Sequence, residues 1–165
     1  MKRTHRIALL GILTAAALIL GWIESMIPFV PYVPGIKLGL GNITVVIALY
    51  KLGRSDALVL SISKVLLSTL LFGSFSGLLY SAAGAAASYL VMCLIYKVRH
   101  FSPIGVSAAG GAAHIIAQLF VAVLMTDTVQ IWRFLPLLMA VGCFTGALTG
   151  FAALLLINKV KWRSF

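Results

Sequence analysis

Residues 54–72 read RSDALVLSISKVLLSTLLF, an apolar run that begins beside a basic residue and carries a lysine, Lys64, in its middle. A helix rises about 1.5 Å per residue, and a transmembrane helix needs roughly 20 mainly apolar residues to cross a hydrocarbon core of about 30 Å. The stretch therefore predicts a membrane-spanning helix whose basic start lies at one membrane surface and whose lysine lies near the midplane.

The rest of the chain repeats this pattern. Hydrophobic residues make up 62% of the 165 residues and charged residues only 10%, which leaves too little polar surface for a soluble domain of this length. The formal net charge of +10 could indicate a nucleic-acid partner, but the basic residues gather beside the apolar runs, as they do next to membrane helices. We therefore expect an integral membrane protein in a lipid bilayer, without a nucleic-acid partner.

The apolar runs predict an all-α fold, a single-domain bundle of six transmembrane helices over residues 1–165. The expected spans cover residues 7–27, 37–52, 56–72, 77–96, 103–125 and 133–158. The first resembles the start of a signal peptide, but its apolar run continues to Ile27, so we interpret it as an uncleaved helix. The second is short and begins in a segment rich in proline and glycine.

Six spans place both termini on the same side of the membrane. Most of the basic residues then fall on that side: Lys2, Arg3, Arg6, Lys51, Arg54, Lys97, Arg99, Lys159, Lys161 and Arg163. Because an excess of lysine and arginine marks cytoplasmic loops, the sequence predicts that both termini are cytoplasmic. The outer side has only Lys37 and Arg133.

Lys64 is the most informative exception to the apolar pattern. It follows Arg54 by ten residues, about 15 Å along a helix. A lysine at the membrane centre costs roughly 2.5–3.5 kcal/mol on insertion scales and usually faces a cavity or a partner. One interpretation is a lysine that extends to the membrane surface. The other, which we favour, is a buried cation that faces an anionic ligand or Glu24.

Further polar residues lie between the predicted midplane and the outer surface, where they predict a pocket open to the outside. They are Glu24, Lys37, Asn42, His114 and Gln118. A histidine alone at this depth is equally compatible with packing, but Gln118 lies four residues from His114 and therefore on the same helix face. Irregular backbone around Lys37 is tolerated at membrane depth where it lines a cavity. Candidate apolar walls of the pocket are Phe72, Phe75, Tyr80 and Trp132.

The first span carries small residues, in two pairs spaced four apart: Gly11 and Ala15, and Ala17 and Gly21. Such spacing lets helix backbones approach closely in lipid. The approach is either packing within the bundle or a smooth surface for another membrane protein. We interpret these four residues as a partner interface.

Motifs for catalysis and energy coupling are missing from the sequence. It has no G-x-x-x-x-G-K-[ST] loop for nucleotide phosphates, and no cysteine–histidine cluster suggests zinc. Its two aspartates, Asp56 and Asp127, are too isolated to hold magnesium for diphosphate chemistry. Cys93 and Cys143 lie in apolar runs and are interpreted as core residues. We expect neither metal nor cofactor, and no enzymatic activity from this chain alone.

The segments ESMIP (24–28) and PGIKLGLGN (34–42) resemble the bacterial family named heptaprenyl diphosphate synthase component I, or Gx transporter, and the resemblance extends over nearly the whole chain. That family is similar to the S components of energy-coupling factor (ECF) transporters, six-helix proteins of the bacterial cell membrane that capture a vitamin or related nutrient from outside. The resemblance implies a pocket under the first outer loop, residues 29–41. It also implies a membrane T component, which docks near Gly11 and Ala15, and two cytoplasmic ATPases.

Two functions remain open at this point. As an S component, the chain would capture an anionic or amphipathic solute from outside. Lys37 and Lys64 would bind its negative charge, Asn42 and the two polar residues of the fifth span would supply hydrogen bonds, and Glu24 would orient a lysine or a ligand amine. The alternative is a non-catalytic membrane component of heptaprenyl diphosphate synthesis in quinone metabolism, in which the two lysines hold the diphosphate.

Overall fold

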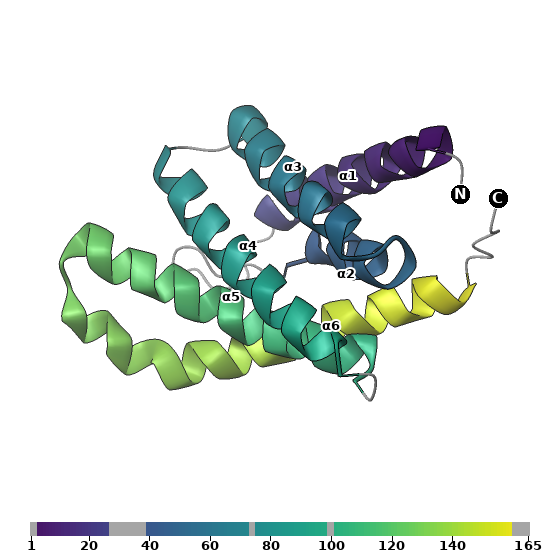
Figure 1. The fold of residues 1–165 in the computed structure, drawn as a ribbon. Coiled ribbons are helices and arrows are strands. Elements are labelled where there is room, and N and C mark those ends of the chain that lie inside the picture. Colours follow the sequence, from purple (N-terminus) through teal and green to yellow (C-terminus); the bar gives the residue numbers. More distant parts are fainter. Residues whose placement is uncertain (1–2, 27–38, 73–74, 99–100, 160–165) are drawn as a thin grey trace.

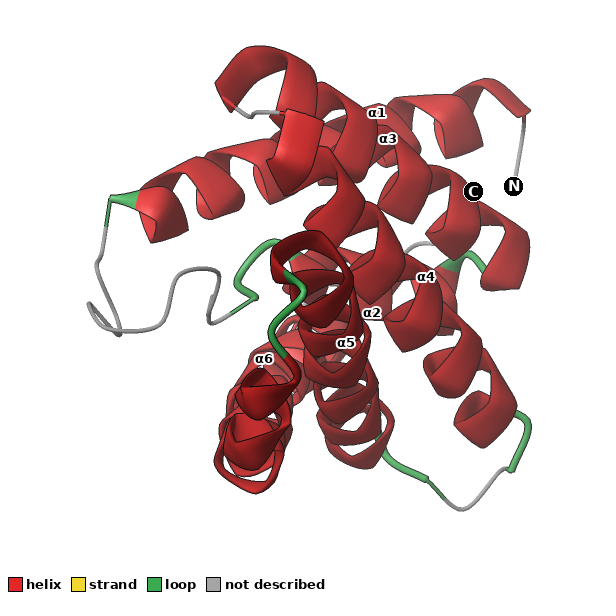
Figure 2. Cartoon of the chain, turned by 90° about the vertical axis from the view of Figure 1, so that its left-hand side faces the viewer, coloured by secondary structure: helices red, strands yellow, loops and turns green. Residues whose placement is uncertain are grey.

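The computed structural model describes residues 3–26, 39–72, 75–98 and 101–159. These residues form seven helical elements: α1 (Arg3–Ser25), α2 (Asn42–Lys51), α3 (Arg54–Phe72), α4 (Phe75–Tyr96), α5 (Pro103–Thr126), the 3-10 helix η1 (Val129–Phe134) and α6 (Leu135–Lys159) (Figure 1). No strand occurs among the described residues (Figure 2). The prediction of an all-α fold is confirmed.

Five apolar stretches are long enough to cross a membrane: α1, α3, α4, α5 and η1 together with α6. Their outer surfaces carry large apolar side chains, such as Leu70 with 81% of its surface exposed and Phe75 with 76%. Exposed apolar area on this scale would be unstable in water but matches the acyl chains of a bilayer. The chain is therefore a multi-pass membrane protein.

The second predicted span differs from the structure. Helix α2 begins at Asn42 and has only ten residues, so it rises about 15 Å, half of the hydrocarbon core. Gly39, with φ +78°, lies in the turn that precedes it. All seven residues of 43–49 are buried, because α1, α3, α5 and α6 surround the helix. The six predicted spans are thus five long helices and one helix inside the bundle that is even shorter than the predicted second span.

The hydrophobic core lies around α2. Its completely buried members come from four helices and are Val46, Ala48, Ala57, Leu60, Val106 and Ala153. Because α2 fills only one half of the bundle, the half beyond its N-terminus is not filled by this core. That geometry decides where a cavity can form.

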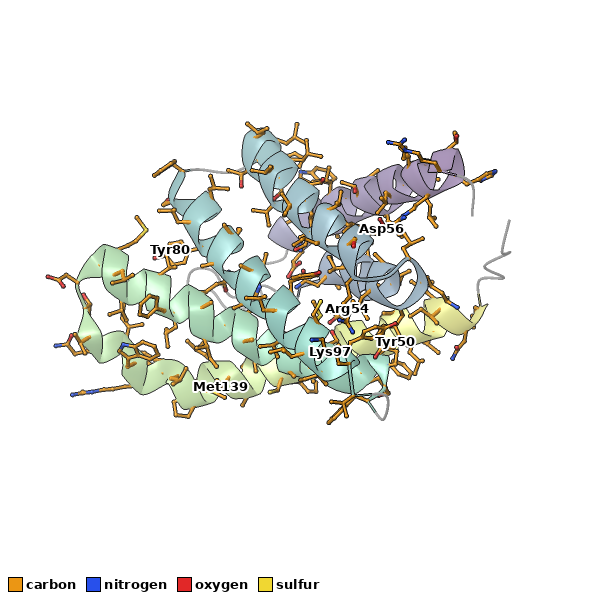
Figure 3. The ribbon with its side chains drawn as sticks, in the orientation of Figure 1. Tyr50, Arg54, Asp56, Tyr80, Lys97 and Met139 are labelled. Carbon is orange, nitrogen blue, oxygen red and sulfur yellow. The ribbon has the colours of Figure 1, made fainter. Side chains whose placement is uncertain are left out.

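Most of the described basic residues lie at one end of the bundle, which is called the basic end below. Arg6 at the start of α1 donates to Asp56 Oδ2 in the first turn of α3, with Nε and Oδ2 2.5 Å apart. At the same end Tyr50 OH donates to the carbonyl of Phe101 at 3.1 Å, which joins the end of α2 to the segment before α5. Figure 3 shows Tyr50, Arg54 and Lys97 at this end and Tyr80 toward the opposite one.

The start of α1 and the end of α6 both lie at the basic end (Figure 1). The described basic residues found there are Arg3, Arg6, Lys51, Arg54, Lys97 and Lys159. The Arg6–Asp56 ion pair shows that α1 and α3 start at the same end. The chain therefore returns to this end between them even though α2 is short.

Helices α5 and α6 touch through their backbones, and they lie side by side in the view of the opposite end (Figure 2). A Cβ atom added to Gly146 would lie 2.5 Å from the carbonyl oxygen of Ser107, and one added to Gly142 would lie 2.8 Å from that of Gly111. Only glycine fits at these positions, which is the close approach that small residues permit in membrane helices.

Gly146→Ala is expected to destabilise the bundle by about 1–3 kcal/mol, because the added methyl group meets backbone that cannot move without separating α5 from α6. Thermal unfolding of the detergent-solubilised protein measures this change. Gly11→Ala is the matched control, since no atom lies within 4 Å of the Cβ position at Gly11 and alanine favours the helix. Equal melting temperatures for the two variants would contradict the contact.

Candidate functional site

A cavity of about 220 Å³ lies inside the bundle, lined by all five long helices and by the turn that leads into α2. Its lining includes Glu24 near the end of α1, Phe72 at the end of α3 and Gly77 near the start of α4. The cavity therefore extends toward the end of the bundle opposite the basic end.

Five of the six predicted binding residues line this cavity: Glu24, Asn42, Lys64, His114 and Gln118. They come from α1, α2, α3 and α5. The sixth, Lys37, lies outside the described residues. The structure thus brings together side chains that the sequence could place only by depth, while their role in binding a solute stays a prediction.

Lys64 is held on the cavity wall by Asn42, whose Oδ1 accepts a hydrogen bond from the lysine Nζ. The N-cap position of α2 is Gly41, and Asn42 is the first residue of the helix. The Asn42 amide oxygen therefore bonds to Lys64 on the cavity wall instead of capping the helix. An amide oxygen orients an ammonium group but does not neutralise it. The cavity wall therefore carries an ammonium group that Asn42 orients.

Glu24 holds the turn before α2. Its carboxylate accepts hydrogen bonds from the backbone N–H of Gly39 at 2.5 Å and of Leu40 at 3.0 Å, and only 6% of the residue is exposed. The turn also lies against α1, since a Cβ atom on Gly41 would be 2.9 Å from the carbonyl oxygen of Ala17. Glu24 thus positions the turn that presents Asn42 to Lys64, a role that the sequence analysis did not assign to it.

His114 and Gln118 lie one turn apart on the face of α5 that lines the cavity. The imidazole of His114 fits against α4 because residue 84 is a glycine: a Cβ atom there would lie 2.6 Å from His114 Cε1. The two side chains form a polar wall, as the spacing predicts.

Buried hydroxyl groups form a part of the cavity that the sequence analysis missed. Ser88, Ser107, Thr145 and Thr149 line it, and each is at most 5% exposed. Serine and threonine are common in membrane helices, so their presence alone gave little signal. Their register could have been used, because Ser107 and His114 are seven residues apart on one face of α5.

Of the four predicted apolar wall residues, only Phe72 lines the cavity, and Trp22 lines it unpredicted. The prediction was wrong for the other three. The α4 face toward the cavity includes Gly77, Ser81 and Ala85, a spacing of four that turns Phe75 and Tyr80 elsewhere. Trp132 packs instead against a separate apolar cluster with Ile115, Leu119 and Leu138.

The small residues of α1 lie on two faces. Gly11 and Ala15 are exposed, as a docking surface requires. Ala17 is 1% exposed, and Gly21 lines the cavity, so these two belong to the interior of the bundle. The reason is the helical period: Ala17 and Gly21 are rotated well away from the first pair. The predicted four-residue interface is reduced to Gly11 and Ala15.

A comparison with protein families matches residues 13–156 to the model described as heptaprenyl diphosphate synthase component I. The matched range includes every residue that lines the cavity. Comparisons with curated proteins and with solved structures found no match.

Glu24→Ala is expected to release the turn before α2, because it removes two hydrogen bonds to a charged acceptor, each worth about 1.5–3 kcal/mol. Amide hydrogen exchange of Gly39 and Leu40, followed by mass spectrometry, should become at least about tenfold faster. Gln118→Ala also removes a cavity side chain but leaves the turn intact, so it serves as the control. Unchanged exchange in Glu24→Ala would show that the carboxylate does not hold the turn.

Proposed function

We propose that this chain, which belongs to the heptaprenyl diphosphate synthase component I family, is the solute-binding membrane subunit of a transporter of the ECF type. The observation that carries the proposal is the polar cavity inside a membrane bundle, with the ammonium group of Lys64 on its wall. The family match and the apolar bundle indicate a membrane component. The cavity is the reason for proposing that this component binds a solute.

Lys64 supports the choice through its depth. It lies ten residues after Arg54, the first residue of α3, which corresponds to about 15 Å from the basic end. A cation at this depth is costly and normally marks the pathway or binding site of a substrate or ion. An anionic group of a solute would offset that cost, and Asn42, His114 and Gln118 would hydrogen-bond its polar atoms.

The direction of uptake follows from the charges. With the basic end in the cytoplasm, the cavity extends toward the outside of a bacterial plasma membrane and takes its solute from there. The turn held by Glu24 belongs to the loop 29–41, which the resemblance to S components implies over the pocket and which includes Lys37. Residues 29–38 lie outside the described part of the chain.

Partners supply the energy in this proposal. The sequence has no nucleotide phosphate-binding loop, so ATP hydrolysis falls to two cytoplasmic ATPases that are coupled through a membrane T component. Gly11 and Ala15, which are exposed on α1, form the docking point. The proposal assigns no catalytic step to this chain. Its three acidic residues lie apart: Asp56 pairs with Arg6 at the basic end, Glu24 holds the turn, and Asp127 is exposed after α5.

The family description favours a second candidate, a non-catalytic membrane component of heptaprenyl diphosphate synthesis. Lys64 would then hold a diphosphate. The size of the cavity, about 220 Å³, weighs against this candidate, since a chain of roughly 35 carbons would extend beyond it. Most of such a chain would have to lie outside the cavity.

Proteins that co-purify with the tagged chain from native membranes distinguish the two candidates. We expect a T component and two ATPases, identified by mass spectrometry, and we expect Gly11→Leu with Ala15→Leu to release them because the side chains fill the docking surface. Ala82→Leu with Ala86→Leu is the matched control on the exposed face of α4. A soluble prenyl synthase in place of the ATPases would establish the second candidate and refute the first.

A further inference from the structure

Three hydroxyl groups form a wall of the cavity where α5 and α6 meet, called the hydroxyl wall below. Ser107 comes from α5, and Thr145 and Thr149 come from α6. Each residue is only 4–5% exposed. Groups buried this deeply affect binding strongly, because a polar atom left without a hydrogen bond away from water is costly.

Two of the three hydroxyl groups donate to backbone carbonyls of their own helix. Thr149 Oγ1 donates to the carbonyl of Gly146 at 2.9 Å, and a hydroxyl has a single proton. Either oxygen can be the donor in the 3.1 Å contact between Ser107 Oγ and Thr149 Oγ1, and with the Thr149 proton on Gly146 the donor is Ser107. Thr145 Oγ1 donates to the carbonyl of Gly142 at 3.3 Å.

In this arrangement the hydroxyl wall offers a solute oxygen lone pairs. Ser68, on α3, extends this character, because it lines the cavity and its Oγ donates to the carbonyl of Val65 at 3.1 Å. A group that donates a hydrogen bond is matched to these oxygens, whereas a group that only accepts would meet lone pairs. Lys64 has the opposite character, since an ammonium group carries only donors and a positive charge.

We infer, on the basis of the proposed solute-binding function, that the solute is a small anion that also carries a hydroxyl or N–H group. The negative charge of the solute lies at Lys64, and its hydrogen-bond donor lies at the hydroxyl wall. The cavity of about 220 Å³ sets the size, on the order of ten non-hydrogen atoms. A site built to hydrogen-bond a substrate hydroxyl discriminates strongly against an analogue that lacks it.

Matched pairs of acids test this inference on the full-length protein in detergent, with binding measured by calorimetry. The pairs are 3-hydroxybutyrate and 3-methoxybutyrate, 4-hydroxybenzoate and 4-methoxybenzoate, and 4-hydroxyphenylacetate and 4-methoxyphenylacetate. Methylation removes the donor and keeps the anion and the oxygen. We expect the hydroxy acid to bind at least about tenfold more tightly in the pair that fits best, the value of one hydrogen bond to a buried group.

Two variants separate the two ends of the cavity. Ser107→Ala removes one acceptor and should bring the hydroxy-to-methoxy ratio close to one. Lys64→Met should weaken both members of each pair and leave the ratio unchanged. Thr126→Val is the control, because Thr126 makes the same kind of bond to the carbonyl of Ala122 but is exposed outside the cavity. Thr149→Val, which keeps the side-chain shape, replaces Ser107→Ala if that variant does not elute as a folded protein.

The outcomes are unambiguous. Equal or tighter binding of the methoxy acids, or a ratio that Ser107→Ala and Thr149→Val both leave intact, would overturn the assignment of the hydroxyl wall. No binding of any of the six acids would overturn the inferred solute class. Neither result contradicts the proposed transporter role if the T component and ATPases co-purify with the chain. Absence of those partners would refute that role, regardless of which acids bind.

Discussion

A lysine in the middle of a membrane-spanning helix is the constraint on which this structure depends. Such a residue costs roughly 2.5–3.5 kcal/mol on insertion scales, so the bundle must provide polar surroundings for Lys64 without exposing backbone to lipid. The short helix α2 meets this need. It fills only the basic half of the bundle with core residues, and its first residue, Asn42, supplies the oxygen that accepts from Lys64.

The position of Asn42 depends in turn on contacts that only particular residues allow. Glu24 fixes the turn through the amides of Gly39 and Leu40, and Gly41 brings that turn against the backbone of α1. On the other side of the cavity, the glycines of α5 and α6 bring the two helices into backbone contact. That contact places Ser107 beside Thr149. Close packing and polar lining are therefore consequences of the same small residues.

Periodicity and depth in the sequence were enough to place most of this site. The apolar runs predicted the long helices, and depth along them selected five residues that line one cavity. Three features were beyond such reasoning. The start of α2 depends on a turn held by a distant carboxylate, the rotation of α4 removed Phe75 and Tyr80 from the wall, and the hydroxyl wall depends on contact between helices. Helix period gives a partial signal for the last two, but which helix faces meet is decided by tertiary contacts.

The central claim is that water reaches the polar cavity around Lys64 from the end opposite the basic end. Labelling intact cells with a membrane-impermeant maleimide tests it most directly, using single cysteines in a variant without Cys93 and Cys143. Thr69→Cys lines the cavity, while Leu70→Cys, at the same depth, is on the lipid-facing surface. The account predicts labelling of position 69 from outside and none of position 70. Labelling of position 69 only from the cytoplasmic side, or from neither side, would contradict it.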